Sequence, residues 1–287
     1  MGLSTEELLR LEAKADELRR VTARTVFDAG SGHIGGAMSV MDIMTILYYR
    51  VMRIKPENPA WEDRDRFVLS KGHAAVGYVS VLADLGYIEK EKLPTFNLTG
   101  STLGMHLDSL KVPGCEASTG SLGHGLPMAL GMALAARLLK KDYRVFCVLG
   151  DGECDEGAVW EAAMAVSHFK ATNLVTLVDR NKCMIDGKTE DVMKLEPFAE
   201  KWRAFGFEAL EIDGHSFEEL DEAIEYSLVP REKPVAVICD TVKGCGIDFM
   251  EDNHKWHYGA INEEMLRKCL TSLDRHYEKR LSRAKGA

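Results

Sequence analysis

The middle of the sequence contains two apolar runs separated by a helical pattern. The runs are Val145–Leu149 and Leu174–Val178, and each is followed by polar residues. Between them, apolar residues recur at three- and four-residue spacing, which is typical of an amphipathic helix. A strand, a helix and a second strand in this order predict a βαβ crossover with parallel strands. The sequence therefore favours an α/β fold built on a parallel sheet.

Polar residues follow both predicted strands. Gly150, Asp151 and Gly152 follow the first, and Asn181 follows the second after 28 intervening residues (181 − 152 − 1). Ligands of open parallel sheets collect at the carboxyl ends of the strands. Carboxylate and amide oxygens suit a hard divalent cation, which also takes phosphate oxygens. Gly152 lets backbone approach a phosphate closely, and the following helix offers unpaired N–H groups. A lone Gly-Asp-Gly is a common turn, but this combination predicts a metal-bridged diphosphate site.

Composition excludes several other classes of protein. The chain has 287 residues and a formal net charge of −9, which disfavours nucleic acid as the main partner. Seven cysteines without a Cys-x-x-Cys motif fit a reducing compartment. The acidic, helical N-terminus is unlike a secretory signal, and no apolar run approaches the length of a membrane span. We therefore expect a cytoplasmic protein without a membrane segment. Because there is no linker or repeat, we expect residues 1–287 to form a single domain.

Further elements are expected along the chain. A capping box beginning at Ser4 starts a helix that Gly30 ends, and a glycine-dense loop follows at 31–36. Residues 93–118 form an ordered excursion over the end of the sheet. The remaining expected helices are Val40–Val51, Ala74–Leu85, Leu126–Lys140, Phe217–Ser227 and Asn262–Arg283, and the remaining expected strands are Phe67–Leu69, Phe207–Ile212 and Val235–Asp240.

Short motifs extend the diphosphate pattern over nearly the whole chain, from about Glu6 to the last helix. In order they are Ser31-Gly32-His33, Asp63–Ser70, Gly72-His73, Gly120–Gly123, Gly150-Asp151-Gly152, Asn181, Ile185-Asp186-Gly187, Ile212–His215 and Trp256–Gly259. Together they resemble the N-terminal, thiamine diphosphate-binding part of transketolase. The resemblance implies a three-layer αβα sandwich with a mainly parallel central sheet.

The resemblance assigns roles to four histidines. His33 and His257 match residues that contact the sugar oxygens, and His257 also matches a contact to a phosphate oxygen. His73 matches a residue at the diphosphate end of the cofactor. His106 lies in a looser match and corresponds to a ligand of a substrate hydroxyl. Taken alone, each histidine is more typical of a surface or hydrogen-bonded structural residue than of a catalytic one.

The resemblance also implies how the cofactor and metal are held. Asp151, Asn181 and the backbone carbonyl of Cys183 correspond to ligands of Mg²⁺, with Ca²⁺ as an alternative. The thiol of Cys183 is not part of this set, and a packing role for that side chain stays open. Thiamine diphosphate contacts are implied for a wider set: His73, Gly120, Ser121, Leu122, Gly150, Asp151, Gly152, Glu153, Glu156, Asn181 and His257.

Within that set, the backbone of residues 120–122 would meet the aminopyrimidine ring. Glu156 would take part in proton chemistry at a subunit interface, although a first-turn Glu also stabilises a helix dipole. His124 stands where related proteins often have Gln, and Asn97 replaces an Arg. The second difference leaves recognition of the far end of the substrate open.

The resemblance further implies a partner. In transketolases, the Glu that activates the cofactor lies in a second domain, C-terminal to everything matched here. We therefore expect one subunit of a split transketolase, active only with a C-terminal subunit that supplies this Glu, in an α₂β₂-like assembly. The expected reaction transfers a two-carbon ketol unit from a ketose or ketose phosphate to an aldose or aldose phosphate, as in the pentose phosphate pathway.

Three alternatives stay open at this point. One is a neighbouring thiamine diphosphate enzyme, such as 1-deoxyxylulose-5-phosphate synthase or the α subunit of a 2-oxoacid dehydrogenase. His33 together with Trp256–Gly259 favours transketolase over these. Another is a transketolase-like enzyme for a sulfosugar or branched sugar. The last is a non-catalytic cofactor-binding or regulatory subunit.

Overall fold

Five parallel strands form the centre of the molecule in the computed structural model, which describes residues 2–286. Their order across the sheet is β1-β2-β3-β5-β4, and every pair of neighbours is parallel. The strands are β1 (Arg66–Leu69), β2 (Val145–Gly150), β3 (Leu174–Arg180), β4 (Glu208–Asp213) and β5 (Val235–Asp240). The predicted βαβ crossover is confirmed: β2 and β3 are adjacent and parallel.

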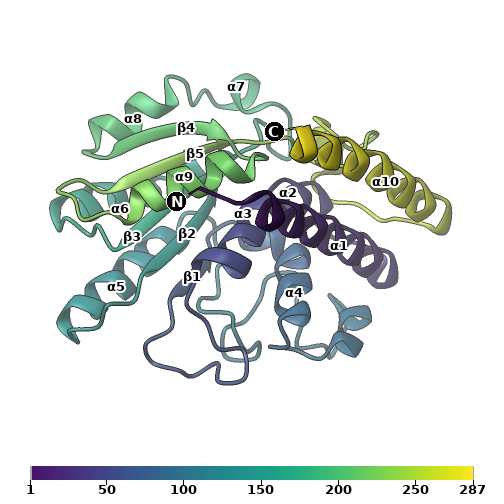
Figure 1. Ribbon diagram of the computed structural model, residues 1–287, viewed down its shortest axis with the longest axis horizontal. Helices are drawn as coiled ribbons and strands as arrows, with labels where there is room; N and C mark the ends of the chain where they lie inside the picture. Colours follow the sequence, from purple (N-terminus) through teal and green to yellow (C-terminus); the bar gives the residue numbers. More distant parts are fainter. Residues whose placement is uncertain (1, 287) are drawn as a thin grey trace.

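Alternating residues of the strands face two separate hydrophobic cores. In β2, Phe146 and Val148 belong to one core, whereas Val145, Cys147 and Leu149 belong to the other. This period of two follows from the pleat of a strand. A sheet buried on both faces needs a layer of helices on each side. The αβα sandwich is therefore confirmed (Figure 1).

The helices divide between these two cores. On the first side lie α1 (Thr5–Ala29), α2 (Ile34–Ser39), α3 (Met41–Ile46), α4 (Ala75–Asp84), α9 (Phe217–Leu228) and α10 (Glu263–Gly286). On the second side lie α5 (Gly125–Leu138), α6 (Gly157–His168) and α8 (Phe198–Ala204). The short helix α7 (Thr189–Val192) follows β3. Helices α1 and α10 run side by side along one edge of the molecule (Figure 1).

The ends of α1 agree with the sequence. The Glu7 amide donates to Ser4 Oγ at 3.3 Å, and the Ser4 amide donates to the Glu7 carboxylate at 3.1 Å, which completes the capping box. Gly30 ends the helix with φ of 74°, a left-handed conformation that costs glycine little. Both predicted boundaries are confirmed.

The region after α1 differs from the sequence prediction. The expected loop at 31–36 is helical from Ile34, and the expected helix Val40–Val51 is divided into α3 and a π-helical turn at Leu47–Val51. The glycines serve close packing instead of a turn: a Cβ at Gly35 would lie 2.6 Å from the carbonyl oxygen of Trp256. The loop was therefore predicted wrongly because dense glycine was interpreted as a loop, whereas the helical conformation expected over Val40–Val51 is confirmed, with a π-helical end.

Smaller differences concern element ends. Strand β3 continues through Asp179 and Arg180, which were expected after the strand, because Arg180 still pairs with Asp240 of β5. Helix α5 ends at Leu138, and Lys140 has positive φ of 53°. In the excursion at 93–118, Phe96 and Leu103 are buried in the first core, which confirms that it is ordered. Among the described residues, no helix combines the length and apolarity required to cross a membrane.

Candidate active site

Four histidines from distant parts of the sequence form one cluster. The ring centroid of His33 lies 5.2 Å from that of His73, 6.1 Å from that of His106 and 5.3 Å from that of His257. His73 and His257 stack at 5.0 Å. His33 precedes α2, His73 follows β1, and His257 lies in a helical turn at His254–His257. The structure thus brings together all four histidines that the sequence singled out.

Two buried lysines lie against this cluster. Lys243 Nζ is 3.1 Å from His257 Nδ1 and donates to the Cys183 carbonyl at 3.1 Å. Lys71 Nζ donates to the Gly36 carbonyl at 2.8 Å and pairs with Asp179. Burial, followed by repulsion from Lys71, lowers the pKa of Lys243 to about 8. Because Asp179 balances the charge of Lys71, Lys243 is the lysine that supplies positive charge to the cluster, and this charge suits an anionic ligand.

The histidines are neutral at physiological pH. Burial, with smaller contributions from His106 and Lys243, lowers the pKa of His33 to about 4. Burial and Lys243 lower the pKa of His257 to about 3. The pKa of His73 is also well below its usual value, through burial and Lys71. A neutral imidazole has one N–H donor and one acceptor nitrogen, so each ring can bind a hydroxyl or exchange a proton.

His33 also has an unused polar atom. Its Nδ1 is buried and makes no hydrogen bond within residues 2–286. Buried polar atoms are almost always paired, so an unpaired one at a polar cluster suggests an absent ligand. His106 is the exposed member of the group. The cluster therefore has both a free donor or acceptor nitrogen and one side chain that solvent reaches.

The predicted metal ligands lie at the carboxyl ends of β2 and β3. Asp151 is buried, and its Oδ2 accepts from the Lys182 amide at 2.6 Å and from Arg180 at 3.3 Å. Asn181 Oδ1 accepts from the Cys183 amide at 3.2 Å. Burial, reinforced by Asp179, raises the pKa of Asp151.

This donor set fits a hard cation. A carboxylate, an amide oxygen and the Cys183 carbonyl are all oxygen ligands, as Mg²⁺ and Ca²⁺ prefer. A divalent cation beside Asp151 would offset the cost of burying its charge, since opposite charge favours the ionised form. The site and the histidine cluster are joined by Lys243, which contacts both Cys183 and His257.

Asp179 is a residue that the sequence reasoning missed. Its buried carboxylate accepts hydrogen bonds from Ser39 at 2.6 Å, from Lys71 and from Thr241. These partners come from α2, from the loop after β1 and from the loop after β5. Asp179 therefore fixes three segments at one edge of the sheet. The available signal was its position at the end of an apolar run, directly before Arg180 and Asn181.

Glu153 also connects separate loops by hydrogen bonds. Its buried carboxylate accepts from the Gly123 amide at 2.9 Å, from the Gly150 amide at 3.0 Å and from Ser70. The carboxylate is thus occupied by protein groups, so the structure gives Glu153 a positioning role. It fixes the Gly-Asp-Gly turn to the loop that begins at Gly120.

That loop lies beside His106. A Cβ placed on Gly120 would come within 3.5 Å of the His106 side chain, so the two segments are in contact. Gly120 and Ser121 are exposed, and Leu122 is half-buried. Glu156 is exposed at the start of α6 and makes no capping hydrogen bond with its side chain. These residues are accessible to a ligand or a second chain.

The two departures from the resemblance are both outside the cluster. His124 is exposed, with Nδ1 3.1 Å from the Leu122 carbonyl oxygen. Asn97 has positive φ of 58°, and its amide donates to the Leu103 carbonyl at 2.7 Å. Asn tolerates this left-handed conformation better than Arg. A large cavity, of about 1420 Å³, lies beside the site instead of within it and includes Asn181 but none of the four histidines.

Comparison with known proteins agrees with this arrangement. Residues 11–280 match the family model described as transketolase, thiamine diphosphate binding domain. The chain is 38% identical to a 6-deoxy-6-sulfo-D-fructose transketolase subunit of Clostridium sp. (strain MSTE9), over 94% of this chain and 98% of that protein. It is 39% identical to an apulose-4-phosphate transketolase subunit of Phocaeicola vulgatus, over 94% of this chain and 95% of that protein.

Larger transketolases match over less than half of their length. Human transketolase is 36% identical over 93% of this chain but only 42% of its own length. The crystal structure of transketolase from Campylobacter jejuni superposes with a TM-score of 0.87 at 31% identity, covering 96% of this chain and 45% of that one. The chain therefore belongs to the transketolase family, as the type of subunit that carries its thiamine diphosphate binding domain.

Proposed function

We propose that this chain is the N-terminal subunit of a two-chain, Mg²⁺-dependent transketolase that transfers a two-carbon ketol unit from a ketose to an aldose. The observation that carries the proposal is the cluster of four neutral histidines beside an oxygen donor set. Transfer of a ketol unit moves protons on and off sugar oxygens, and neutral imidazoles near the reacting carbons suit this task.

The cofactor would lie along the carboxyl edge of β2 and β3. Asp151, Asn181 and the Cys183 carbonyl would bind Mg²⁺, or Ca²⁺ in its place, and the backbone at 150–152 would approach the diphosphate. His73 and Lys243 would add positive or hydrogen-bonding contacts to the diphosphate oxygens. Thiamine diphosphate, when bound, supplies the electron sink for breaking a bond next to a ketone. The residues of the chain would hold the cofactor in position.

The sugar would lie over the histidine cluster. His33 and His257 would donate to or accept from the carbonyl and hydroxyl oxygens of the donor sugar. His106, at the exposed side, would contact a hydroxyl farther along the substrate. Gly120, Ser121 and Leu122 would border the pyrimidine end of the cofactor. Together these groups would hold the donor sugar in one orientation while protons move at its oxygens.

A partner is required by the chemistry. The Glu that activates the cofactor in transketolases has no counterpart among the matched motifs, so we assign it to a separate C-terminal subunit. We further propose an α₂β₂-like assembly, with each cofactor at a subunit interface. Exposed Gly120, Ser121 and Glu156 are accessible to the second chain.

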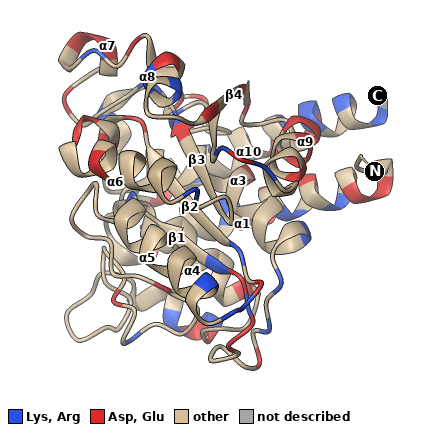
Figure 2. Cartoon of the chain, turned by 90° about the vertical axis from the view of Figure 1, so that its left-hand side faces the viewer, with Lys and Arg blue, Asp and Glu red and all other residues tan. Residues whose placement is uncertain are grey.

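An apolar surface supports self-association. Helices α5 and α6 carry one charged residue each, Arg137 and Glu161, and α5 is drawn almost entirely without charge in Figure 2. Exposed apolar side chains on or just after these helices are Met128, Leu138, Leu139, Met164 and Phe169. Apolar surface of this kind on one face is typical of a protein–protein interface.

The donor sugar is the open part of the proposal. Two of the relatives are named for 6-deoxy-6-sulfo-D-fructose and for apulose 4-phosphate. A substrate outside the common pentose and hexose phosphates is therefore an alternative to the pentose phosphate pathway. A non-catalytic, cofactor-binding subunit is the other alternative, and the retained histidine cluster argues against it.

Reconstitution tests the proposal. The chain would be assayed for ketol transfer alone and mixed with a candidate C-terminal transketolase subunit, using pentose, hexose, sulfosugar and branched-sugar phosphates as donors. We expect turnover only in the mixture, with one donor class preferred. Full turnover by the isolated chain would contradict the split enzyme. Cofactor binding without turnover in any mixture would favour the non-catalytic subunit.

A further inference from the structure

A second cluster of metal-binding side chains lies between the loop after β5 and helix α10. It contains the thiol of Cys245, the carboxylate of Glu251 and the imidazole of His276. One ligand atom from each residue lies within 4.8 Å of the other two. None of the three belongs to the histidine cluster or to the oxygen donor set at Asp151.

The spacing is close to that of a tetrahedral zinc site. The sulfur of Cys245 is 4.0 Å from Nε2 of His276. Zinc binds sulfur at about 2.3 Å and nitrogen at about 2.0–2.1 Å, so at the tetrahedral angle the two ligand atoms are about 3.6 Å apart. A shift of a few tenths of an ångström would therefore be enough to bring these side chains to ligand distance.

The loop that carries Cys245 has a fixed shape. Gly244 and Gly246 on either side of it have φ of 77° and 92°. The Gly246 amide donates to Glu251 Oε1 at 2.9 Å, which holds the carboxylate against the same turn. A Cβ at Gly246 would lie 2.9 Å from Leu273 and 3.4 Å from His276, so the loop packs directly on α10. Two ligands are thus presented by one turn and the third by the helix that it contacts.

Charge around the cluster favours a divalent cation. Asp42 contacts Arg19 at 2.6 Å, Arg280 at 3.0 Å and His215 at 2.7 Å, and Glu12 pairs with Arg280. These two carboxylates and two guanidinium groups cancel. The thiolate of Cys245 and the carboxylate of Glu251 would then be the two anionic ligands that a divalent cation meets.

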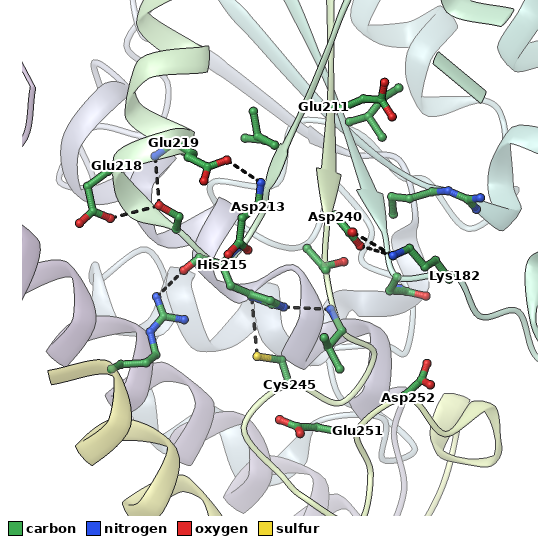
Figure 3. Close-up of a pocket in the computed structure, with 18 of the residues that line it drawn as sticks. Lys182, Glu211, Asp213, His215, Glu218, Glu219, Asp240, Cys245, Glu251 and Asp252 are labelled. Carbon is green, nitrogen blue, oxygen red and sulfur yellow. Dashed lines mark hydrogen bonds and ion pairs between the residues drawn. The ribbon is translucent and has the colours of Figure 1, made fainter. Parts of the chain in front are cut away.

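His215 lies on the other side of the sulfur but is already engaged. Its Nδ1 is 2.7 Å from Asp42 and 3.7 Å from the Cys245 sulfur, and its Nε2 accepts from the Val242 amide at 2.9 Å. Both ring nitrogens therefore have protein partners, and we do not count His215 as a ligand. Figure 3 shows its ring next to Cys245, with Glu251 on the opposite side of the thiol.

A cation can reach the cluster from solvent. Cys245 itself is only 3% exposed, but it lines the cavity of about 1420 Å³ together with Glu251 and His276. Glu251 is exposed and His276 is half-buried. The opening leaves room for a water molecule as a fourth ligand, because zinc sites with three protein ligands take water in the open position.

We propose that Cys245, Glu251 and His276 form a binding site for a borderline-soft divalent cation such as Zn²⁺, separate from the oxygen donor set at Asp151. Binding connects the loop after β5 to α10 through the cation. Lys243, two residues before Cys245, is in the same loop and contacts Cys183 and His257. The cation would therefore stabilise the segment that presents Lys243 to the active site.

Cobalt titration of the full chain tests the site. Saturating Mg²⁺ would occupy the oxygen donor set, and Co²⁺ would then be added while the thiolate-to-cobalt charge-transfer absorption is followed. We expect one equivalent to produce the absorption in the unmodified chain. Cys245→Ser should abolish it. Glu251→Gln, which retains the bond to the Gly246 amide, and His276→Gln should each weaken binding by more than about a hundredfold, beyond the effect typical of an outer contact.

Matched controls make the result specific. Cys269→Ser removes a different buried thiol, which lies on α10, and His168→Gln removes an exposed imidazole of α6; both variants should retain the absorption. Zn²⁺ should also raise the melting temperature of the unmodified chain but not that of His276→Gln. If Cys245→Ser fails to fold, the partly exposed His276 and Glu251 variants still decide the question. Absence of the absorption in the unmodified chain, or its persistence in Cys245→Ser or His276→Gln, would overturn the proposal.

Discussion

The imidazoles of His33 and His257 have pKa values lowered to about 4 and about 3, mainly by burial. In the unfolded chain both titrate near about pH 6.5. From about pH 6.5 down to about pH 4 the unfolded state therefore binds more protons than the folded state, and the free energy of unfolding falls as the pH falls. Urea unfolding of the ligand-free chain between pH 7.5 and pH 5 would measure this slope. The double variant His33→Asn, His257→Asn should reduce it, and an unchanged slope would contradict the neutral cluster.

Substitution of His33 should affect turnover more than cofactor binding. In the reconstituted enzyme, His33→Ala removes a group assigned to sugar oxygens, so kcat should fall by about 10²–10⁴-fold, the usual range for loss of a general acid–base group. The affinity for thiamine diphosphate should stay within a few-fold, because the diphosphate contacts are elsewhere. Steady-state kinetics and calorimetry separate the two effects. Normal turnover with weaker cofactor binding would show that His33 belongs to the cofactor site.

Lys243 should contribute to cofactor affinity through its charge. Lys243→Met retains most of the buried stem but removes the ammonium group that lies against Cys183 and His257. We expect weaker binding of thiamine diphosphate, because an anionic diphosphate loses a nearby positive charge. Lys255→Met is the control, since Lys255 is exposed in a neighbouring turn. Equal affinities for the two variants would remove Lys243 from the site.

The histidines could be predicted because each occurs in a short motif with a recognisable order. The structure then shows that His33, His73, His106 and His257 meet at one place. Lys71 and Lys243 carried no such local signal, since a lysine in a loop is usually solvated. Their burial depends on contacts with Asp179 and Cys183 that are 108 and 60 residues away in the sequence. Such pairings arise only from the topology of the sheet.

At the scale of the element, the N-terminal cap of α1 offers a direct test. Ser4→Ala removes the side chain that accepts from the Glu7 amide, and we expect the free energy of unfolding to fall by about 1 kcal/mol. Ser4→Gly should cost only a few tenths of a kcal/mol, because glycine exposes the helix end to water. Urea unfolding at pH 7 would compare the free energies of unfolding of the unmodified chain, Ser4→Ala and Ser4→Gly. Equal stability of Ser4→Ala and the unmodified chain would show that the cap is not used.

The accuracy of the sequence prediction differed between kinds of element. Apolar runs predicted four of the five strands, because such strands of a parallel sheet are buried on both faces. Strand β4 was also predicted, although it lies at an edge of the sheet and contains two glutamates and an aspartate. Helices with clear caps, such as α1, were also predicted with their ends. Short helices α7 and α8 were missed, since four and seven residues give too few turns to show a period. Helix α2 was predicted wrongly because its glycines allow close packing against Trp256.

At the scale of the molecule, the apolar surface of α5 and α6 should control association. Met164→Lys places a charge where a side chain that is 57% exposed projects from α6. We expect the association constant of the chain to decrease, because a buried unpaired charge at an interface is costly. Leu110→Lys, at a residue that is 94% exposed in the excursion, is the control. Sedimentation equilibrium would measure the association constant of each variant. Identical association constants for Met164→Lys and Leu110→Lys would place the interface elsewhere.

Titration with the cofactor tests most directly whether the chain is the subunit that binds thiamine diphosphate through Mg²⁺. Thiamine diphosphate with Mg²⁺ would be titrated calorimetrically into the chain alone and into its mixture with a C-terminal subunit, for the unmodified chain and for Asp151→Ala. We expect Mg²⁺-dependent binding that tightens with the partner and is lost in Asp151→Ala, since a direct ligand of the metal is removed. Unchanged affinity in Asp151→Ala, or no binding by the unmodified chain in either sample, would contradict it.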